Sequence, residues 1–236
     1  WSLRWYRNMI GDCSADVVSS TVPCSTKWMT GTINSFFIGI VATAIATALG
    51  TLAALGLSRP HMPYKGLIMS ILISPMIVPL IITAAGMFFF YSKIGLTHTY
   101  LGLILAHTAL GTPFVVITVT ATLTGFDTNL IRASQSLGAD TMRTFFKVIM
   151  PLILPGVISG GLFAFITSFD EVVVVMFVGS VEQITIPKQM WAGLRQETSP
   201  VILCMATCLV ALSIALLTTV EMLRRRSERL RGIKQR

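Results

Sequence analysis

Long apolar runs separated by short polar segments dominate the hydrophobic pattern of this 236-residue chain. Uncharged intervals occupy residues 28–58, 66–92, 94–126, 148–169 and 198–220. Each interval can supply the roughly 20 residues that a helix needs to cross the hydrocarbon core of a bilayer. The pattern therefore predicts an all-α fold, a polytopic transmembrane helical bundle with five spans in this chain.

The segment 127–151 departs from this pattern, because polar and apolar residues are mixed in it at helical spacing. Asp127 or Thr128 can cap a first helix, and Gly138 suits the left-handed residue that ends it. The apolar positions of this helix are Leu130, Ala133 and Leu137. Asp140 or Thr141 can then cap a second helix.

The second helix is predicted to be amphipathic, and Pro151 opens the segment that follows it. Its apolar face consists of Met142, Phe145, Phe146 and Ile149, with Arg143 and Lys147 on another face. Together the two helices predict an exposed helical hairpin with an apolar docking face.

The hairpin sequence resembles the EAA loop of ABC-importer permeases. The resemblance rests on Arg132-Ala133-Ser134, three further residues, Gly138, and the closing Ile149-Met150-Pro151. Arg132 stands where that family usually has Glu, and Ser134 stands at its second Ala. In the family this loop is the coupling helix, which sits in a cleft of a cytoplasmic ATPase and passes ATP-driven closure to the transmembrane helices.

The resemblance implies an ATPase-coupling role for ten residues of the hairpin, whereas the alternative is an amphipathic loop that is only structural. The ten residues are Arg132, Ala133, Ser134, Leu137, Gly138, Ala139, Asp140, Arg143, Phe145 and Phe146.

Composition supports a membrane protein. The chain is 53% hydrophobic and 12% charged, with a mean hydropathy of +0.76, whereas about a quarter of the residues of a soluble domain are charged. The net charge of +8 is spread over the loops and is not a nucleic-acid signal.

Lys and Arg also predict the orientation of the chain, since they are enriched in cytoplasmic loops. The basic end Arg224-Arg225-Arg226 marks a cytoplasmic C-terminus, and alternating five spans back from it leaves twelve Lys/Arg inside and six outside. We therefore predict an extracytoplasmic segment 1–32, a transmembrane domain 33–223 containing the hairpin, and a basic cytoplasmic tail 224–236.

Several polar or helix-breaking residues within the spans are candidates for a translocation pathway. Pro75 and Pro79 predict a kink or local unwinding, which either borders a pathway or is only structural. His107 lies in the outer third of its span and either lines the route or is a packed histidine bonded to Thr108, Thr112 or backbone carbonyls.

The acidic pair Asp170-Glu171 lies inside an apolar run. A carboxylate within a span is costly, so the pair should face protein or a water-filled path, and adjacent positions diverge by about 100° around a helix, so only one is expected to face a path. A cationic solute would be attracted there. The alternative is a structural pair held by Lys188, Arg195 or a partner permease.

The sequence predicts no catalytic, metal or cofactor site in this chain. No Cys/His cluster has metal-ligand spacing, and neither a glycine-rich phosphate loop nor a nucleophile motif is present. The chain is expected to bind no cofactor, and ATP to be used by partner subunits. Cys204 and Cys208, in an apolar span, are interpreted as packed thiols, whereas Cys13 and Cys24 form either a disulfide or two free thiols.

The wider resemblance is to the spermidine/putrescine (polyamine/opine) branch of binding-protein-dependent type I ABC importer permeases. It adds four segments to the hairpin: Ser2-Leu3-Arg4-Trp5-Tyr6, Leu105-Ala106-His107, Ser168-Phe169-Asp170-Glu171 and Ile186-Pro187. It implies the type I permease fold, with one further span expected before Trp1.

The family also implies an inner-membrane location and partners. The partners would be a second, homologous permease, two cytoplasmic ATPase subunits and an extracytoplasmic solute-binding protein. Two other classes of function agree less well with the sequence. An ion-gradient-driven secondary transporter would usually show inverted repeats, which we do not find, and a membrane enzyme or scaffold finds no catalytic constellation.

Overall fold

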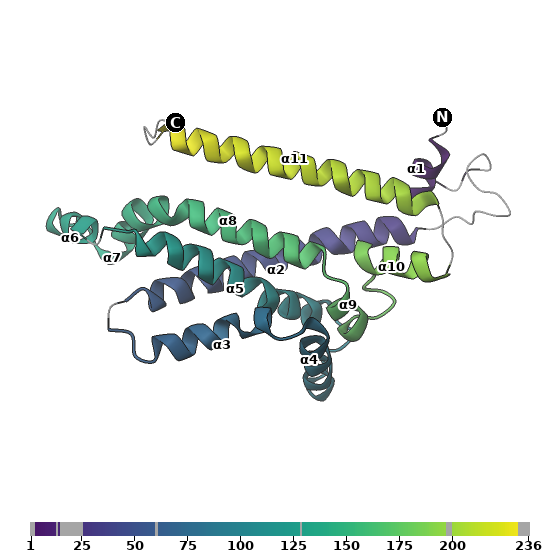
Figure 1. The fold of residues 1–236 in the computed structure, drawn as a ribbon, viewed down its shortest axis with the longest axis horizontal. Helices are drawn as coiled ribbons and strands as arrows, with labels where there is room; N and C mark the ends of the chain where they lie inside the picture. Colours follow the sequence, from purple (N-terminus) through teal and green to yellow (C-terminus); the bar gives the residue numbers. More distant parts are fainter. Residues whose placement is uncertain are drawn as a thin grey trace. The chain divides into compact units, whose positions relative to one another are not determined.

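The computed structural model describes residues 3–12, 14, 26–59, 61–127, 129–196 and 200–230, and the regular elements in these ranges are all helices (Figure 1). They group into two compact units, residues 1–32 with 189–236 and residues 33–188. In chain order the helices are α1 (Arg4–Met9), α2 (Lys27–Leu57), α3 (Lys65–Ile77), α4 (Leu80–Ile94), α5 (Tyr100–Thr124), α6 (Asn129–Ser136), α7 (Thr141–Thr144), the π-helical η1 (Phe145–Ile149), α8 (Met150–Phe169), α9 (Val173–Val178), α10 (Ile186–Gln196) and α11 (Pro200–Leu230).

Within the described part of the chain, three helices are long and apolar enough to cross a bilayer. They are Lys27–Leu57, Tyr100–Thr124 and the continuous helix Thr141–Phe169, and a fourth span results if α3 and α4 count as one bent span. The predicted fifth span, 198–220, falls in α11, where the apolar stretch Pro200–Ala215 is shorter. By length and composition alone, the described residues thus contain three or four candidate spans.

The predicted span 66–92 is broken at the second of its two prolines. α3 and α4 meet at an angle of 103°, where Val78 is extended, as a residue before proline prefers. Pro75, by contrast, lies inside α3. Pro75 has no amide hydrogen to donate to the Ile71 carbonyl. This carbonyl accepts a hydrogen bond from the Ser74 hydroxyl at 2.8 Å instead. The kink predicted from both prolines therefore arises at Pro79 alone.

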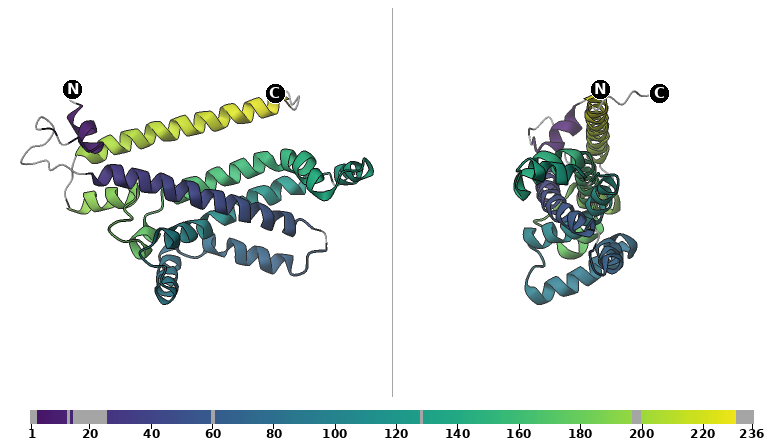
Figure 2. Two further views of the ribbon diagram at one scale, coloured as in Figure 1. Left: turned by 180° about the vertical axis from the view of Figure 1, so that it is seen from behind. Right: turned by 90° about the vertical axis from the view of Figure 1, so that its left-hand side faces the viewer.

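Residues 33–188 are built around α2, α5 and α8, which run side by side in the views of Figures 1 and 2. Glycines allow the close approach: a Cβ at Gly50 of α2 would lie 2.6 Å from Cβ of Val115, and one at Gly160 of α8 would clash with the Thr118 hydroxyl. Four small residues of α2 are buried, Gly39, Ala42, Ala46 and Gly50. Small residues at such positions let helix backbones pack closely in membranes.

The connecting segments of this unit gather at two opposite ends. The turn between α2 and α3 lies at the same end as α6 and α7, whereas α9 lies at the other (Figure 1). At that second end the His98 amide donates to the Val178 carbonyl at 2.8 Å, which joins the α4–α5 turn to α9. The helices therefore alternate in direction as a polytopic bundle requires.

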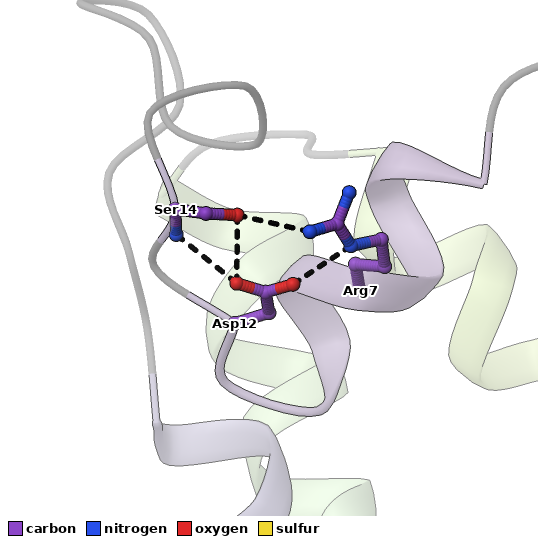
Figure 3. A network of polar contacts seen from close by, with 3 residues as sticks. All are labelled: Arg7, Asp12 and Ser14. Atoms are coloured by element: carbon purple, nitrogen blue, oxygen red, sulfur yellow. Dashed lines mark hydrogen bonds and ion pairs between the residues drawn. The ribbon is translucent and has the colours of Figure 1, made fainter.

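The other unit contains α1 and α11, which contact each other. Arg7, in the last turn of α1, donates through Nε to Asp12 Oδ2 at 2.7 Å, and the Ser14 hydroxyl and amide both donate to Asp12 Oδ1 (Figure 3). The hydrogen bonds from Ser14, followed by that from Arg7, lower the pKa of Asp12. Cys13 and Cys24, whose pairing the sequence left open, lie outside the described residues.

Candidate functional site

The 127–151 hairpin begins and turns where its sequence predicts. Asp127 Oδ1 accepts a hydrogen bond from the Asn129 amide at 2.9 Å at the start of α6. Asp140 is the N-cap of α7, where its Oδ1 accepts from the Arg143 amide at 2.7 Å. Each carboxylate thus satisfies an amide that a helix leaves unpaired at its N-terminus.

Gly138 ends α6 in the left-handed conformation, with φ +81°. Its amide donates to the Gln135 carbonyl at 2.9 Å, and the Ala139 amide donates to the Ser134 carbonyl at 3.1 Å. This pair of bonds is a Schellman motif, which requires a residue at positive φ and therefore favours glycine. The predicted role of Gly138 as a helix terminator is confirmed.

One side-chain contact ties the two arms of the hairpin together. The hydroxyls of Ser134 in α6 and Thr144 in α7 lie 2.6 Å apart, and Thr144 is buried. Ser134 is one of the two departures from the EAA pattern, and here its hydroxyl makes an interhelical hydrogen bond. The other departure, Arg132, is exposed.

The single apolar face predicted on the second helix is divided. Met142 and Phe146 are 66% and 60% exposed, whereas Phe145 and Ile149 are half-buried. The π turn over Phe145–Ile149 causes this division, because it inserts one residue into the helical repeat. Pro151 gives the reason for the π turn, since it has no amide hydrogen to donate to the Lys147 carbonyl, and the Met150 amide donates to the Phe145 carbonyl instead.

The helix also continues through Pro151 rather than ending before it. α7, η1 and α8 form one helix from Thr141 to Phe169, with Pro151 in the first turn of α8. The second arm of the hairpin is therefore the start of a membrane-spanning helix, so that a force on this arm acts directly on the bundle.

The acidic pair lies where α8 ends, and the structure separates its two members. Glu171 is 7% exposed and its Oε1 accepts from the Val174 amide at 2.9 Å, which caps α9. Asp170 is exposed. The difference in exposure between Asp170 and Glu171 agrees with the prediction that the two adjacent side chains point in different directions.

Both acids line a depression of about 350 Å³. Its lining consists of Leu80, Ile166, Thr167, Asp170, Glu171, Val172 and Val173. Leu80 comes from the first turn of α4, directly after Pro79, so the proline break brings α4 to the acids. Pro75, about one helical turn before Pro79 and inside α3, is not part of this lining.

His107 lies apart from the depression, in the packed interface between α5 and α8. It is 2% exposed, and its Nδ1 lies 2.7 Å from the Ser168 hydroxyl. The sequence analysis expected Thr108, Thr112 or backbone carbonyls as partners of a packed His107. This prediction of the partner is wrong. Ser168 belongs to the segment Ser168-Phe169-Asp170-Glu171, which carries part of the family resemblance. Spacing along the chain gives no reason to pair it with a residue 61 positions away.

Lys188 was a candidate partner for the acids, and it bonds elsewhere. Its Nζ donates to the Ser180 carbonyl at 2.8 Å and to the Val175 carbonyl at 3.4 Å. Burial lowers the pKa of Lys188. Lys188 thus holds the α9–α10 connection, which Asn34 also binds through the carbonyls of Glu182 and Ile184.

The described residues thus form a bundle of apolar helices with a helical hairpin at one end and an acidic depression near the other. Solved structures with the same fold include a chain of the MetNI methionine ABC transporter in an inward-facing conformation, with a TM-score of 0.64, 22% identity and coverage of 88% of this chain and 96% of that one. A bacterial ABC transporter involved in the import of alginate matches with a TM-score of 0.67, 15% identity and coverage of 83% and 75%.

The chain belongs to the family of inner membrane components of binding-protein-dependent transport systems, whose sequence profile matches residues 28–229. It is 31% identical over 195 residues to the spermidine/putrescine transport system permease protein PotC of Haemophilus influenzae, covering 83% of this chain and 76% of that protein. It is 28% identical over 220 residues to the putrescine transport system permease protein PotI of Escherichia coli K12, covering 89% and 73%.

Family and fold confirm the central predictions. The chain is a multi-pass inner-membrane permease subunit of an ABC importer, a transport component and not an enzyme. The family implies partnership with an ATPase, a solute-binding protein and a second permease. Membership also excludes the alternative of an ion-gradient-driven secondary transporter.

Proposed function

We propose that this chain forms, with a second homologous permease, the translocation pathway of a polyamine importer. Two ATPase subunits on the cytoplasmic side and one extracytoplasmic solute-binding protein complete the assembly. The similarity to PotC and PotI supports a polyamine as the solute. The exposed carboxylate of Asp170 in the depression agrees with a cationic solute, because opposite charge raises the local concentration of the solute.

In this proposal the 127–151 hairpin couples ATP hydrolysis to transport. The exposed apolar side chains Leu137, Met142 and Phe146 provide its docking surface, and its second arm is continuous with α8. The chain itself binds no nucleotide, and ATP is used by the partner subunits.

Reconstituted transport tests the proposal. Proteoliposomes that contain the permease pair, the ATPase and the binding protein are expected to accumulate spermidine or putrescine only when ATP is enclosed with the ATPase. Leaving out the ATPase is the control. Uptake that needs an ion gradient and no ATP would contradict the ATP-driven mechanism, and ATP-dependent uptake of another solute class would contradict only the polyamine assignment.

We further propose that the C-terminus and the hairpin face the cytoplasm and that the α9–α10 connection faces outward. The Lys/Arg asymmetry supports this orientation, as does the location of the hairpin and α9 at opposite ends of the bundle (Figure 1). In a cysteine-free background, a cysteine in place of Val181, which is 84% exposed in the α9–α10 connection, is expected to react with an impermeant thiol reagent in intact cells, whereas one at 65 or 232 is not. The reverse labelling pattern would refute the orientation.

A further inference from the structure

The two acids and three cations of the hairpin are all exposed, but the acids accept hydrogen bonds from the backbone of the hairpin. Asp127 and Asp140 each accept a hydrogen bond from a helix-terminal amide. Arg132, Arg143 and Lys147 are exposed. Among the residues that the structure describes, none receives a hydrogen bond or ion pair from these three side chains. The charges that the described residues leave unpaired on the hairpin are therefore basic.

The same surface carries apolar side chains that this chain leaves uncovered. Leu137 is 89% exposed, and Leu130 is 43% exposed. On α6 the half-buried side chains are Ile131 and Ser134, so Arg132 lies beside the packed side and not on it. Met142 and Phe146 extend the exposed apolar surface onto the second arm.

The hairpin holds this surface in a fixed shape. The Schellman motif at Gly138, the aspartate caps and the bond between Ser134 and Thr144 fix the turn and both arms. A surface that is ordered before binding loses less entropy in a shaped cleft. A membrane surface can also take up basic and apolar side chains, but only a protein cleft makes use of the fixed shape of the turn.

We infer that the hairpin docks into an apolar cleft of the ATPase subunit whose rim is acidic, with carboxylates opposite Arg132 and Arg143. This inference rests on the proposed coupling role and adds the chemistry of the partner surface. Complementary charge across an interface selects partners and speeds association, and exposed pairs of this kind are screened by salt. The basic hairpin therefore distinguishes its own ATPase from one whose cleft is basic at the rim.

Binding of the ATPase to the permease pair in nanodiscs tests the inference. For the native permease, affinity is expected to fall roughly tenfold between about 50 mM and about 500 mM NaCl. Double reversal, Arg132→Glu with Arg143→Glu, is expected to weaken binding at low salt by about tenfold and to reverse the trend with salt. Arg132→Gln should give an intermediate loss.

The matched control is Lys65→Glu, which reverses an exposed cation outside the hairpin and should bind like the native permease. Unchanged affinity and unchanged salt dependence in the double reversal would overturn the inference. A loss confined to nanodiscs with anionic lipid, and absent in neutral phosphatidylcholine, would also overturn it and assign the cations to headgroups. Failure of the native permease to bind any ATPase would refute the proposed function instead.

Discussion

Replacing Gly138 with valine is expected to abolish solute uptake while the permease still inserts into the membrane. Gly138 has φ +81°, and no atom lies within 4 Å of the position that a Cβ would take. The cost of the side chain is therefore in the backbone alone, about 1–2 kcal/mol for leaving a residue with a Cβ in the left-handed region. A β-branched side chain is particularly unfavourable there, so the turn changes conformation and the second arm is displaced.

Two substitutions provide controls. Gly138→Asn should retain most of the uptake, because asparagine tolerates the left-handed conformation. Gly125→Val adds the same side chain at a nearby exposed glycine that has φ −90° and open space around it, and it should also transport. Uptake is measured in membrane vesicles together with solute-stimulated ATPase activity. Native values of both in Gly138→Val would refute the coupling role of the hairpin.

The two neighbouring acids are expected to give different defects when they are changed. Asp170→Asn should reduce uptake of a cationic solute by roughly fivefold to tenfold, because it removes the exposed charge from the depression at nearly constant shape. Assembly with the ATPase should stay normal, since the Asp170 carboxylate forms no hydrogen bond or ion pair with the other described residues. Uptake of a neutral solute, if one is carried, should not change.

Glu171 is expected to be structural. Glu171→Leu removes the acceptor of the Val174 amide, and leaving a buried donor unpaired costs about 1–3 kcal/mol. The amount of assembled complex and the uptake should then fall in parallel. Glu171→Gln keeps an oxygen acceptor and should be milder. Measuring both quantities in the same membranes decides the assignment: parallel losses in Asp170→Asn, or a selective loss of uptake in Glu171→Gln, would contradict it.

The sequence by itself determined the features that depend on neighbours along the chain. The apolar runs predicted the helices α2, α5 and α8, because an apolar segment of about 20 residues must form a helix to satisfy its backbone in lipid. Asp140 and Gly138 predicted where α7 begins and α6 ends, since capping and the left-handed turn involve only residues a few positions away. The family resemblance in the hairpin rested on the same local spacing.

Only the tertiary structure decided which residues meet across the bundle. It paired His107 with Ser168, divided the acids into a buried cap and an exposed carboxylate, and turned α4 by 103° so that Leu80 reaches the depression. The pattern of apolar positions carries little of this information, because in lipid the outward face of a helix is as apolar as its packed face. Which side of each helix packs is then decided by small residues and hydrogen bonds between helices distant in the chain, and these depend on the positions of all the helices together.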